Sequence, residues 1–151
     1  MTVGQGFDKE HAVMPQTLNG GLYRVKRAST ASKSVQHAAI ADVGNRLGLL
    51  PRQEVFNRSA VVMVHQTPPT LQYELHQDGL GDEWTVEASI PDETGARHRL
   101  EAAKANPKYD ALGNNCEHFA SFIADGKRTS PQLWALGVFA SVLVLLLIVS
   151  D

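Results

Sequence analysis

The sequence has very little cysteine, no excess of basic residues and no closely spaced metal ligands. Its 151 residues include one cysteine, Cys116, so the chain can form no internal disulfide and suits a reducing compartment. The formal net charge is -2, which argues against a nucleic-acid-binding protein. The six histidines are scattered, and no pair has a metal-binding spacing such as HExxH. We therefore expect no metal and no other cofactor.

The composition is that of a globular protein, with 43% hydrophobic and 20% charged residues. The length is enough for one domain with a substantial core. Residues 1–16 lack the apolar segment of a signal peptide. We expect an N-terminal arm over 1–20, a folded domain over 21–130 and a distinct C-terminal segment over 131–151.

Strand patterns come first along the domain and helix patterns near its end, which predicts an α+β fold with an antiparallel sheet packed against helices. Strands are expected over residues 22–25, 35–43 and 60–65, with a mobile loop over 26–34 between the first two. Residues 71–75 and 84–90 are expected to pair as a hairpin. Helices are expected over 97–105 and 119–124, with a loop over 91–95.

The most informative stretch surrounds Cys116. Asn115 is suited to cap the helix that follows, because its side-chain oxygen can accept a backbone N–H. Cys116 would then lie in the first helical turn, where the helix dipole favours an anion and should lower the thiol pKa. A thiolate is a nucleophile, so catalysis is one interpretation. The alternative is that Cys116 is a small buried hydrophobic residue.

Two histidines are candidate partners for this thiol. His37 lies on the small, apolar face of the strand expected over 35–43, and His65 ends the strongly apolar strand over 60–65. Each can instead be a satisfied core or surface histidine. His118 is two residues from Cys116, about 200° around the helix, so it should not reach the sulfur. We expect His118 to bond the loop that sets Cys116, and Glu117 to be a first-turn residue favoured by the dipole.

An almost wholly apolar run covers residues 133–149. At about 1.5 Å per residue a helix of this length reaches roughly 26 Å, close to the hydrocarbon thickness of a thin bilayer. Trp134 suits an interfacial position, and Lys127 and Arg128 precede the run. The run predicts a single-pass C-terminal membrane anchor with the domain on the cytoplasmic side. A buried core helix is the alternative.

The segment Asn115-Cys116-Glu117-His118-Phe119 resembles the NCEHF signature of the lecithin:retinol acyltransferase-like proteins, the H-box/NC relatives of the NlpC/P60 thiol hydrolases. The segment beginning at His37 resembles the H-box, and residues 61–69 resemble the second-histidine segment. Tyr109 and residues 123–126 also fit the pattern, and the apolar tail resembles the anchor of small phospholipid acyltransferases. Ala38 departs from it, because tryptophan usually follows the first histidine, and the spacing between the histidines is longer here.

The resemblance implies a circularly permuted NlpC/P60-like fold and a membrane-anchored phospholipid acyltransferase or phospholipase A. It implies Cys116 as nucleophile, His37 as general base and His65 as the residue that orients His37. The substrate would be a glycerophospholipid ester, reached at the membrane surface. Picornaviral nonstructural proteins share the H-box/NC pattern, so the alternative is a non-enzymatic protein that binds host proteins or remodels membranes. A cysteine peptidase or amidase is a third reading, which the tail disfavours.

Overall fold

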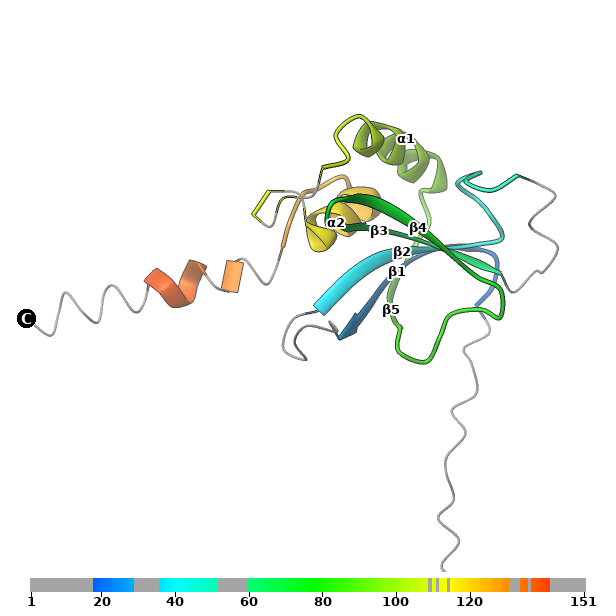
Figure 1. Cartoon of the computed structure of the whole chain (residues 1–151), viewed down its shortest axis with the longest axis horizontal. Coiled ribbons are helices and arrows are strands. Elements are labelled where there is room, and N and C mark those ends of the chain that lie inside the picture. Colours follow the sequence, from blue (N-terminus) through cyan, green and yellow to red (C-terminus); the bar gives the residue numbers. More distant parts are fainter. Residues whose placement is uncertain are drawn as a thin grey trace, which may run out of the picture.

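The computed structural model describes residues 18–28, 36–51, 60–108, 110, 112–113, 115–130, 134–135 and 137–141. They form an α+β fold in which two helices pack on one face of a five-stranded antiparallel sheet (Figure 1). The strand order across the sheet is β4-β3-β2-β1-β5. The elements in chain order are β1 (Gly21–Ala28), β2 (Gln36–Val43), β3 (Val61–Thr67), β4 (Thr70–His76), β5 (Thr85–Ile90), α1 (Glu93–Lys104) and α2 (Cys116–Asp125).

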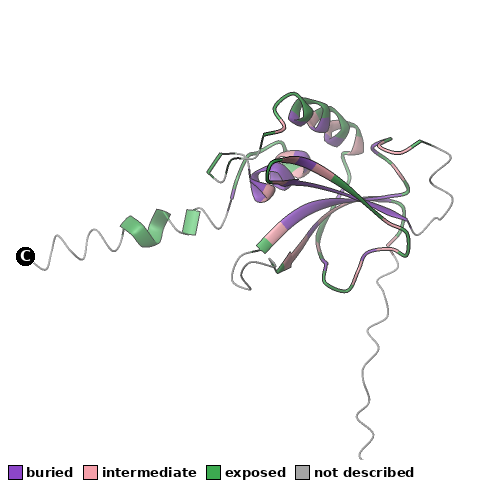
Figure 2. Ribbon diagram, viewed as in Figure 1, coloured by how far each residue is buried: buried purple, intermediate pink, exposed green. Residues whose placement is uncertain are grey.

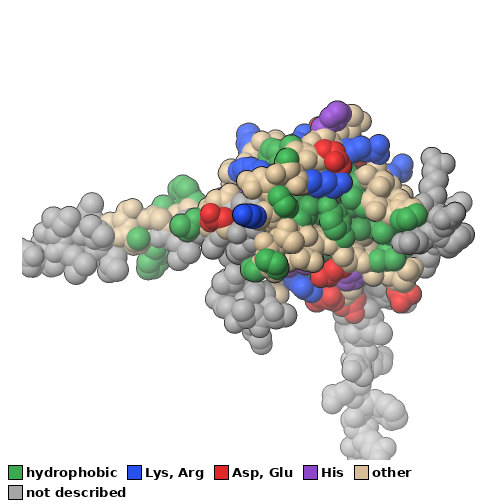
Figure 3. All heavy atoms as spheres, turned by 45° about the horizontal axis from the view of Figure 1, so that its top comes forward, with side chains coloured by type: hydrophobic (Ala, Val, Ile, Leu, Met, Phe, Trp, Pro, Cys, Tyr) green, Lys and Arg blue, Asp and Glu red, His purple; other side chains and the backbone are tan. Residues whose placement is uncertain are grey.

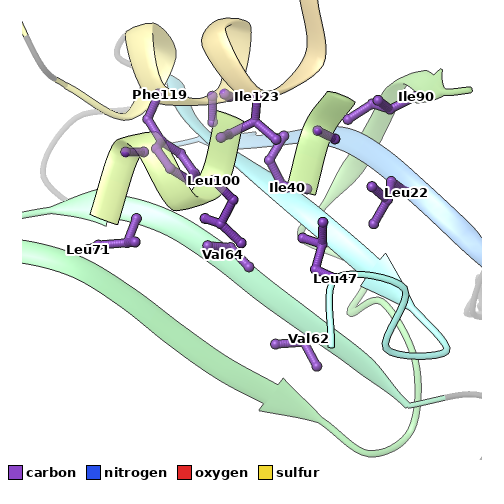
Figure 4. Packing of buried hydrophobic residues seen from close by; sticks show 14 residues of the cluster. Leu22, Ile40, Leu47, Val62, Val64, Leu71, Ile90, Leu100, Phe119 and Ile123 are labelled. Atoms are coloured by element: carbon purple, nitrogen blue, oxygen red, sulfur yellow. The ribbon is translucent and has the colours of Figure 1, made fainter. Parts of the chain in front are cut away.

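Alternating strand residues divide the core into two layers. On the helix side, Ile40 and Val64 pack against Leu100 of α1 and against Phe119 and Ile123 of α2 (Figure 4). All five side chains are almost inaccessible to water. Since α2 lies over β2, and also touches β1 and β3, this layer fixes the position of the α2 N-terminus on the sheet.

The opposite face is covered by the chain between β4 and β5. Leu80 and Trp84 from this connection are buried against strand residues that include Val25, Ala39 and Met63. The connection carries the chain from one edge of the sheet to the other, because β4 and β5 are the two edge strands. The predicted hairpin between residues 71–75 and 84–90 is therefore wrong. Instead, β4 forms a hairpin with β3, and their pairing runs from Val61↔His76 to Thr67↔Thr70.

Most of the predicted elements are confirmed, and two extend further than expected. β1 continues through Ala28, so the segment predicted as a loop from residue 26 begins as strand paired with β2. α1 begins at Glu93 rather than at Arg97, because Asp92 caps it by accepting the Gly95 N–H at 2.9 Å. The burial pattern of β2 and β3 agrees with their apolar sequences, as the purple ribbon in Figure 2 shows.

The predicted membrane anchor falls mostly outside the described residues. Those of its residues that are described, 134–135 and 137–141, are helical and exposed (Figure 2). Trp134 and Phe139 are among its exposed apolar side chains, and Figure 3 shows hydrophobic side chains on this segment. Ser141 donates a hydrogen bond to the carbonyl of Gly137 at 2.8 Å, as expected for a serine within a helix. Within the described residues, no helix has the length and apolar character needed to cross a bilayer.

Candidate active site

Cys116 is the first residue of α2, as the sequence predicts. Asn115 has extended backbone angles, and its side-chain oxygen accepts the His118 N–H at 3.0 Å. At the other end Gly126 adopts a left-handed conformation with φ of 75° and ends the helix. Cys116 is partly buried and is a free thiol. The cap therefore places the sulfur in the first turn, where backbone N–H groups have no partner within the helix.

Backbone N–H groups surround the Cys116 sulfur, but burial has the larger effect on its acidity. Burial raises the pKa of the thiol, and the negative charge of Glu117 adds to this increase. Hydrogen bonds from the N–H groups of Ala38, Glu117 and Cys116 itself oppose it. The net direction is upward, so the prediction of a lowered thiol pKa is wrong. The helix N-terminus favours the thiolate, but removing the sulfur from water costs more.

His37 and His65 are brought together, as the site prediction requires. His37 Nε2 lies 2.6 Å from His65 Nδ1, and the two rings meet edge to face with centroids 4.9 Å apart. The two residues lie on neighbouring strands, β2 and β3, on the sheet face covered by Trp84. The His65 side chain is almost fully buried. One ring nitrogen of His37, Nδ1, is left outside this contact.

Cys116 reaches the same end of β2 from the helix side. Its sulfur accepts the N–H of Ala38, the residue that follows His37. The β2–β3 pairing runs from Val43↔Val61 to Ile40↔Val64, and among the described residues it does not continue toward Gln36. The strands are therefore unpaired at His37 and at Ala38, the residue whose N–H contacts the sulfur. In the described structure no hydrogen bond joins the sulfur to either ring. The sulfur approaches β2 from the helix side, whereas His37 packs against Trp84 on the other face, so the three residues do not form a closed triad.

Burial keeps both histidines neutral at physiological pH. It lowers the pKa of His37 to about 4, and the nearby positive charges of His65 and Arg27 act in the same direction. Burial also lowers the pKa of His65, although Glu74 opposes this through its charge and a hydrogen bond. A neutral imidazole retains a lone pair that can accept a proton. His37 is thus in the protonation state that a general base needs.

Other residues near the site have structural roles. The buried Nδ1 of His118 has no hydrogen-bond partner, so this nitrogen does not make the predicted bond to the loop. Glu117 is a first-turn residue, as expected, but it is buried and accepts a hydrogen bond from Ser130. Asp42, on the other face of β2 from His37, accepts the N–H groups of Arg46 and Leu47 at 2.6 and 2.8 Å. The Asp42 carboxylate holds a turn and does not orient His37.

Three residues that sequence reasoning missed surround the histidines. Glu74 on β4 lies 3.1 Å from His65 Nε2. Trp84 lies against the His37 ring, with centroids 5.8 Å apart, and Arg27 stacks on Trp84 at 4.5 Å. Arg27 also pairs directly with His37 across β1 and β2. Arg27 was missed because it was predicted to lie in the loop after the first strand, whereas β1 continues to Ala28 and places Arg27 opposite His37.

No protein-family model matches the chain, and neither a curated protein nor a solved structure is significantly similar to it. Within the described residues no group of three or more histidine, cysteine, aspartate or glutamate side chains is arranged to hold a metal ion.

Proposed function

We propose that this protein is a thiol acyltransferase or phospholipase A of the lecithin:retinol acyltransferase-like type, with a circularly permuted NlpC/P60-like fold. The observation that carries the proposal is the 2.6 Å contact between His37 and His65, beside the strand residue whose N–H contacts the Cys116 sulfur. A nucleophile next to a base that is held by a third group is the general pattern of covalent catalysis. The order of these residues along the chain also agrees with the resemblance.

The chemistry begins with a neutral thiol and a neutral imidazole. His37 accepts the thiol proton at Nδ1 as Sγ attacks the ester carbonyl of a glycerophospholipid. The carbon–oxygen bond to the lysophospholipid breaks, and His37 returns the proton to the leaving alcohol oxygen. The acyl group is then held as a thioester. Water completes a phospholipase reaction, whereas an amine or a lysolipid hydroxyl completes an acyl transfer. Each gives a proton to His37, which passes it to the Cys116 sulfur as the carbon–sulfur bond breaks.

Nδ1 is the ring nitrogen best placed for this step. Nε2 is engaged by His65, and Nδ1 lies on the side of the ring nearest the backbone, where the sulfur contacts the next residue. Catalytic hydrogen bonds are often long in the free enzyme and tighten when substrate binds. The proposal requires Sγ and Nδ1 to come within hydrogen-bond distance in the substrate complex.

Backbone N–H groups at the start of α2 support stabilisation of the oxyanion. The N–H groups of Cys116 and Glu117 both point toward the sulfur, so a carbonyl attacked there would develop its negative charge close to them. The first-turn position predicted for Cys116 thus has a catalytic use, although it does not lower the thiol pKa.

The predicted membrane anchor supports lipid esters as the substrate class. The apolar run over residues 133–149 follows the domain closely, after Lys127 and Arg128. A domain tethered to the cytoplasmic face of a bilayer meets phospholipid esters at high local concentration. A hydrolase of soluble peptides gains nothing from such an anchor.

The test is transfer or release of a labelled acyl chain from phosphatidylcholine vesicles by the full chain. We expect activity in the wild type and its loss in Cys116→Ala and His37→Ala, with a labelled thioester trapped on Cys116. His118→Phe is the matched control, because it changes a histidine of the same helix turn that has no part in the chemistry. Full activity in Cys116→Ala would overturn the mechanism.

A non-enzymatic H-box/NC protein is the second candidate. Two observations favour it: the raised pKa of the Cys116 thiol, and the lack of a hydrogen bond between the described thiol and either histidine ring. Such a protein would act by binding proteins or membranes and would be inert in the vesicle assay while folded and membrane-bound. Labelling of Cys116 by an activated-ester lipid probe separates the two candidates, since only the enzyme should react faster than its His37→Ala variant.

A further inference from the structure

Glu74 extends the pair of histidines into a chain of three side chains. Its Oε1 lies 3.1 Å from His65 Nε2, the nitrogen opposite the one that contacts His37. His65 lies opposite Gln72 in the β3–β4 ladder, so Glu74 is its diagonal neighbour on the same face of the hairpin. Glu74 is half exposed, whereas His65 is almost fully buried. The carboxylate therefore joins the buried histidines to the surface.

The donor and acceptor capacities of these groups determine where the protons lie. A carboxylate can only accept a hydrogen bond, so His65 must carry its proton on Nε2. Because burial keeps His65 neutral, its Nδ1 then has a lone pair and no proton. The 2.6 Å contact with that lone pair requires a proton on His37 Nε2. A neutral His37 with a proton on Nε2 has none on Nδ1.

We propose that Glu74 is a positioning residue that sets the tautomers of His65 and His37, so that His37 presents an unprotonated Nδ1 to the Cys116 thiol. This inference rests on the proposed function for its consequence in catalysis, but the tautomers themselves are a property of the resting protein. Glu74 touches neither the thiol nor the substrate and acts only through His65.

Without Glu74 the protons on the two histidines can be placed in a second way. His65 can then carry its proton on Nδ1 and donate to His37 Nε2, which places the His37 proton on Nδ1 and removes the base. The other charged groups near the two histidines do not hold the proton on His65 Nε2. Arg27 of β1 is a cation and cannot accept a hydrogen bond, and His76 of β4 lies 3.5 Å from the other Glu74 oxygen. Glu83 is held by Arg27 at 3.9 Å. Among the described residues, Glu74 is the only hydrogen-bond partner of His65 Nε2.

The experiment compares Glu74→Gln, Glu74→Asp and wild type, with Glu101→Gln as the matched control. Glu101 is an exposed carboxylate on α1 that bonds to Lys104 and has no contact with the histidines. Long-range 1H–15N spectra of the full chain in micelles report which nitrogen of each ring is protonated, with assignments from single histidine substitutions. We expect protonated Nε2 in both rings of wild type and Glu101→Gln, and mixed tautomers in Glu74→Gln.

Acyl transfer is measured on the same samples. In Glu74→Gln we expect kcat to fall about 10- to 100-fold with KM nearly unchanged, and Glu74→Asp to recover part of kcat because it restores a carboxylate. Unchanged tautomers in Glu74→Gln would overturn the inference, whatever the activity. An inactive wild type with the expected tautomers would overturn the proposed function and leave the positioning role of Glu74 supported.

Discussion

Arg27 and His37 face one another directly across β1 and β2, and the guanidinium of Arg27 lies over the same Trp84 ring that packs against His37. The candidate base therefore packs against a buried tryptophan that also carries a permanent positive charge on its ring. Burial is the main reason for its low pKa, followed by the charges of His65 and Arg27, while Glu74 opposes them.

Replacing Arg27 with glutamine should raise the pKa of His37 above its value of about 4, toward the ordinary histidine range, because one of the charges that disfavour the imidazolium is removed. An NMR titration of the His37 ring measures this directly. Lys26→Gln is the control. This substitution also removes one positive charge from β1, but Lys26 forms its ion pair with Glu87, at 3.0 Å. An equal shift in both variants would contradict a specific effect of Arg27.

Alkylation of Cys116 should depend on pH in the manner of a buried thiol. Because burial and Glu117 raise its pKa, the rate with iodoacetamide should still be increasing above about pH 8.5, the ordinary thiol value. In Glu117→Gln the curve should move to lower pH, because one cause of the increase is removed. A plateau already reached at pH 7 would show instead a preformed thiolate and an ion pair with His37.

The Asn115 cap should contribute both stability and activity. Asn115→Ala removes the acceptor for the His118 N–H and should lower the free energy of unfolding by about 1 kcal/mol. It should also lower kcat, because the first turn that carries Cys116 loosens. Asn115→Ser restores a capping oxygen and should recover most of both quantities, as chemical denaturation and the vesicle assay will show. A loss of stability in Asn115→Ser as large as in Asn115→Ala would rule out capping as the cause.

The domain should lose stability in mild acid. Burial lowers the folded-state pKa of His37, His65 and His118, so the unfolded chain takes up protons first as the pH falls below about 6.5. The contribution of these neutral rings to the free energy of unfolding is complete above that pH. It declines as the pH falls toward the folded-state pKa, which for His37 is about 4. Asp42 acts in the opposite sense, because burial raises the pKa of its carboxyl group.

Urea denaturation at pH 7.5, 6.5 and 5.5 measures this slope. We expect the free energy of unfolding to fall with pH in wild type and to fall less in His37→Gln, which lacks one of the titrating rings. Asp42→Asn should make the fall steeper, because the group that opposes it is removed. A free energy that stays constant across this interval would contradict neutral, buried histidines.

Local sequence patterns predicted the elements that bear the site. The apolar runs at β2 and β3 and the cap-and-glycine pattern of α2 depend on neighbours within a few residues, and their positions are confirmed. The approach of His37 to His65 was implied by the resemblance to a family, and the 2.6 Å contact between their rings agrees with it. The resemblance to a family added the pairing of these histidines with Cys116, which stays a prediction.

Other features depend on contacts that no local pattern encodes. The pairing of β4 depends on the turn after β3 and on the burial of Leu80 and Trp84, which draw the following chain across the sheet. Glu74 became a neighbour of His65 only through that register. The predicted decrease in the Cys116 pKa was wrong for a similar reason. The capping pattern places the thiol at the positive end of the helix dipole, but it does not indicate how deeply the sulfur is buried.

The order of the elements has a consequence for synthesis of the chain on the ribosome. α2 is the last of the seven named elements, and it contributes both the thiol and the Phe119 and Ile123 side chains that complete the helix-side core. A nascent chain that has released β1–β5 and α1 therefore holds the histidine pair but no cysteine. The thiol is therefore synthesised with the helix that completes the core, so the chain carries no thiol until the domain can fold around it.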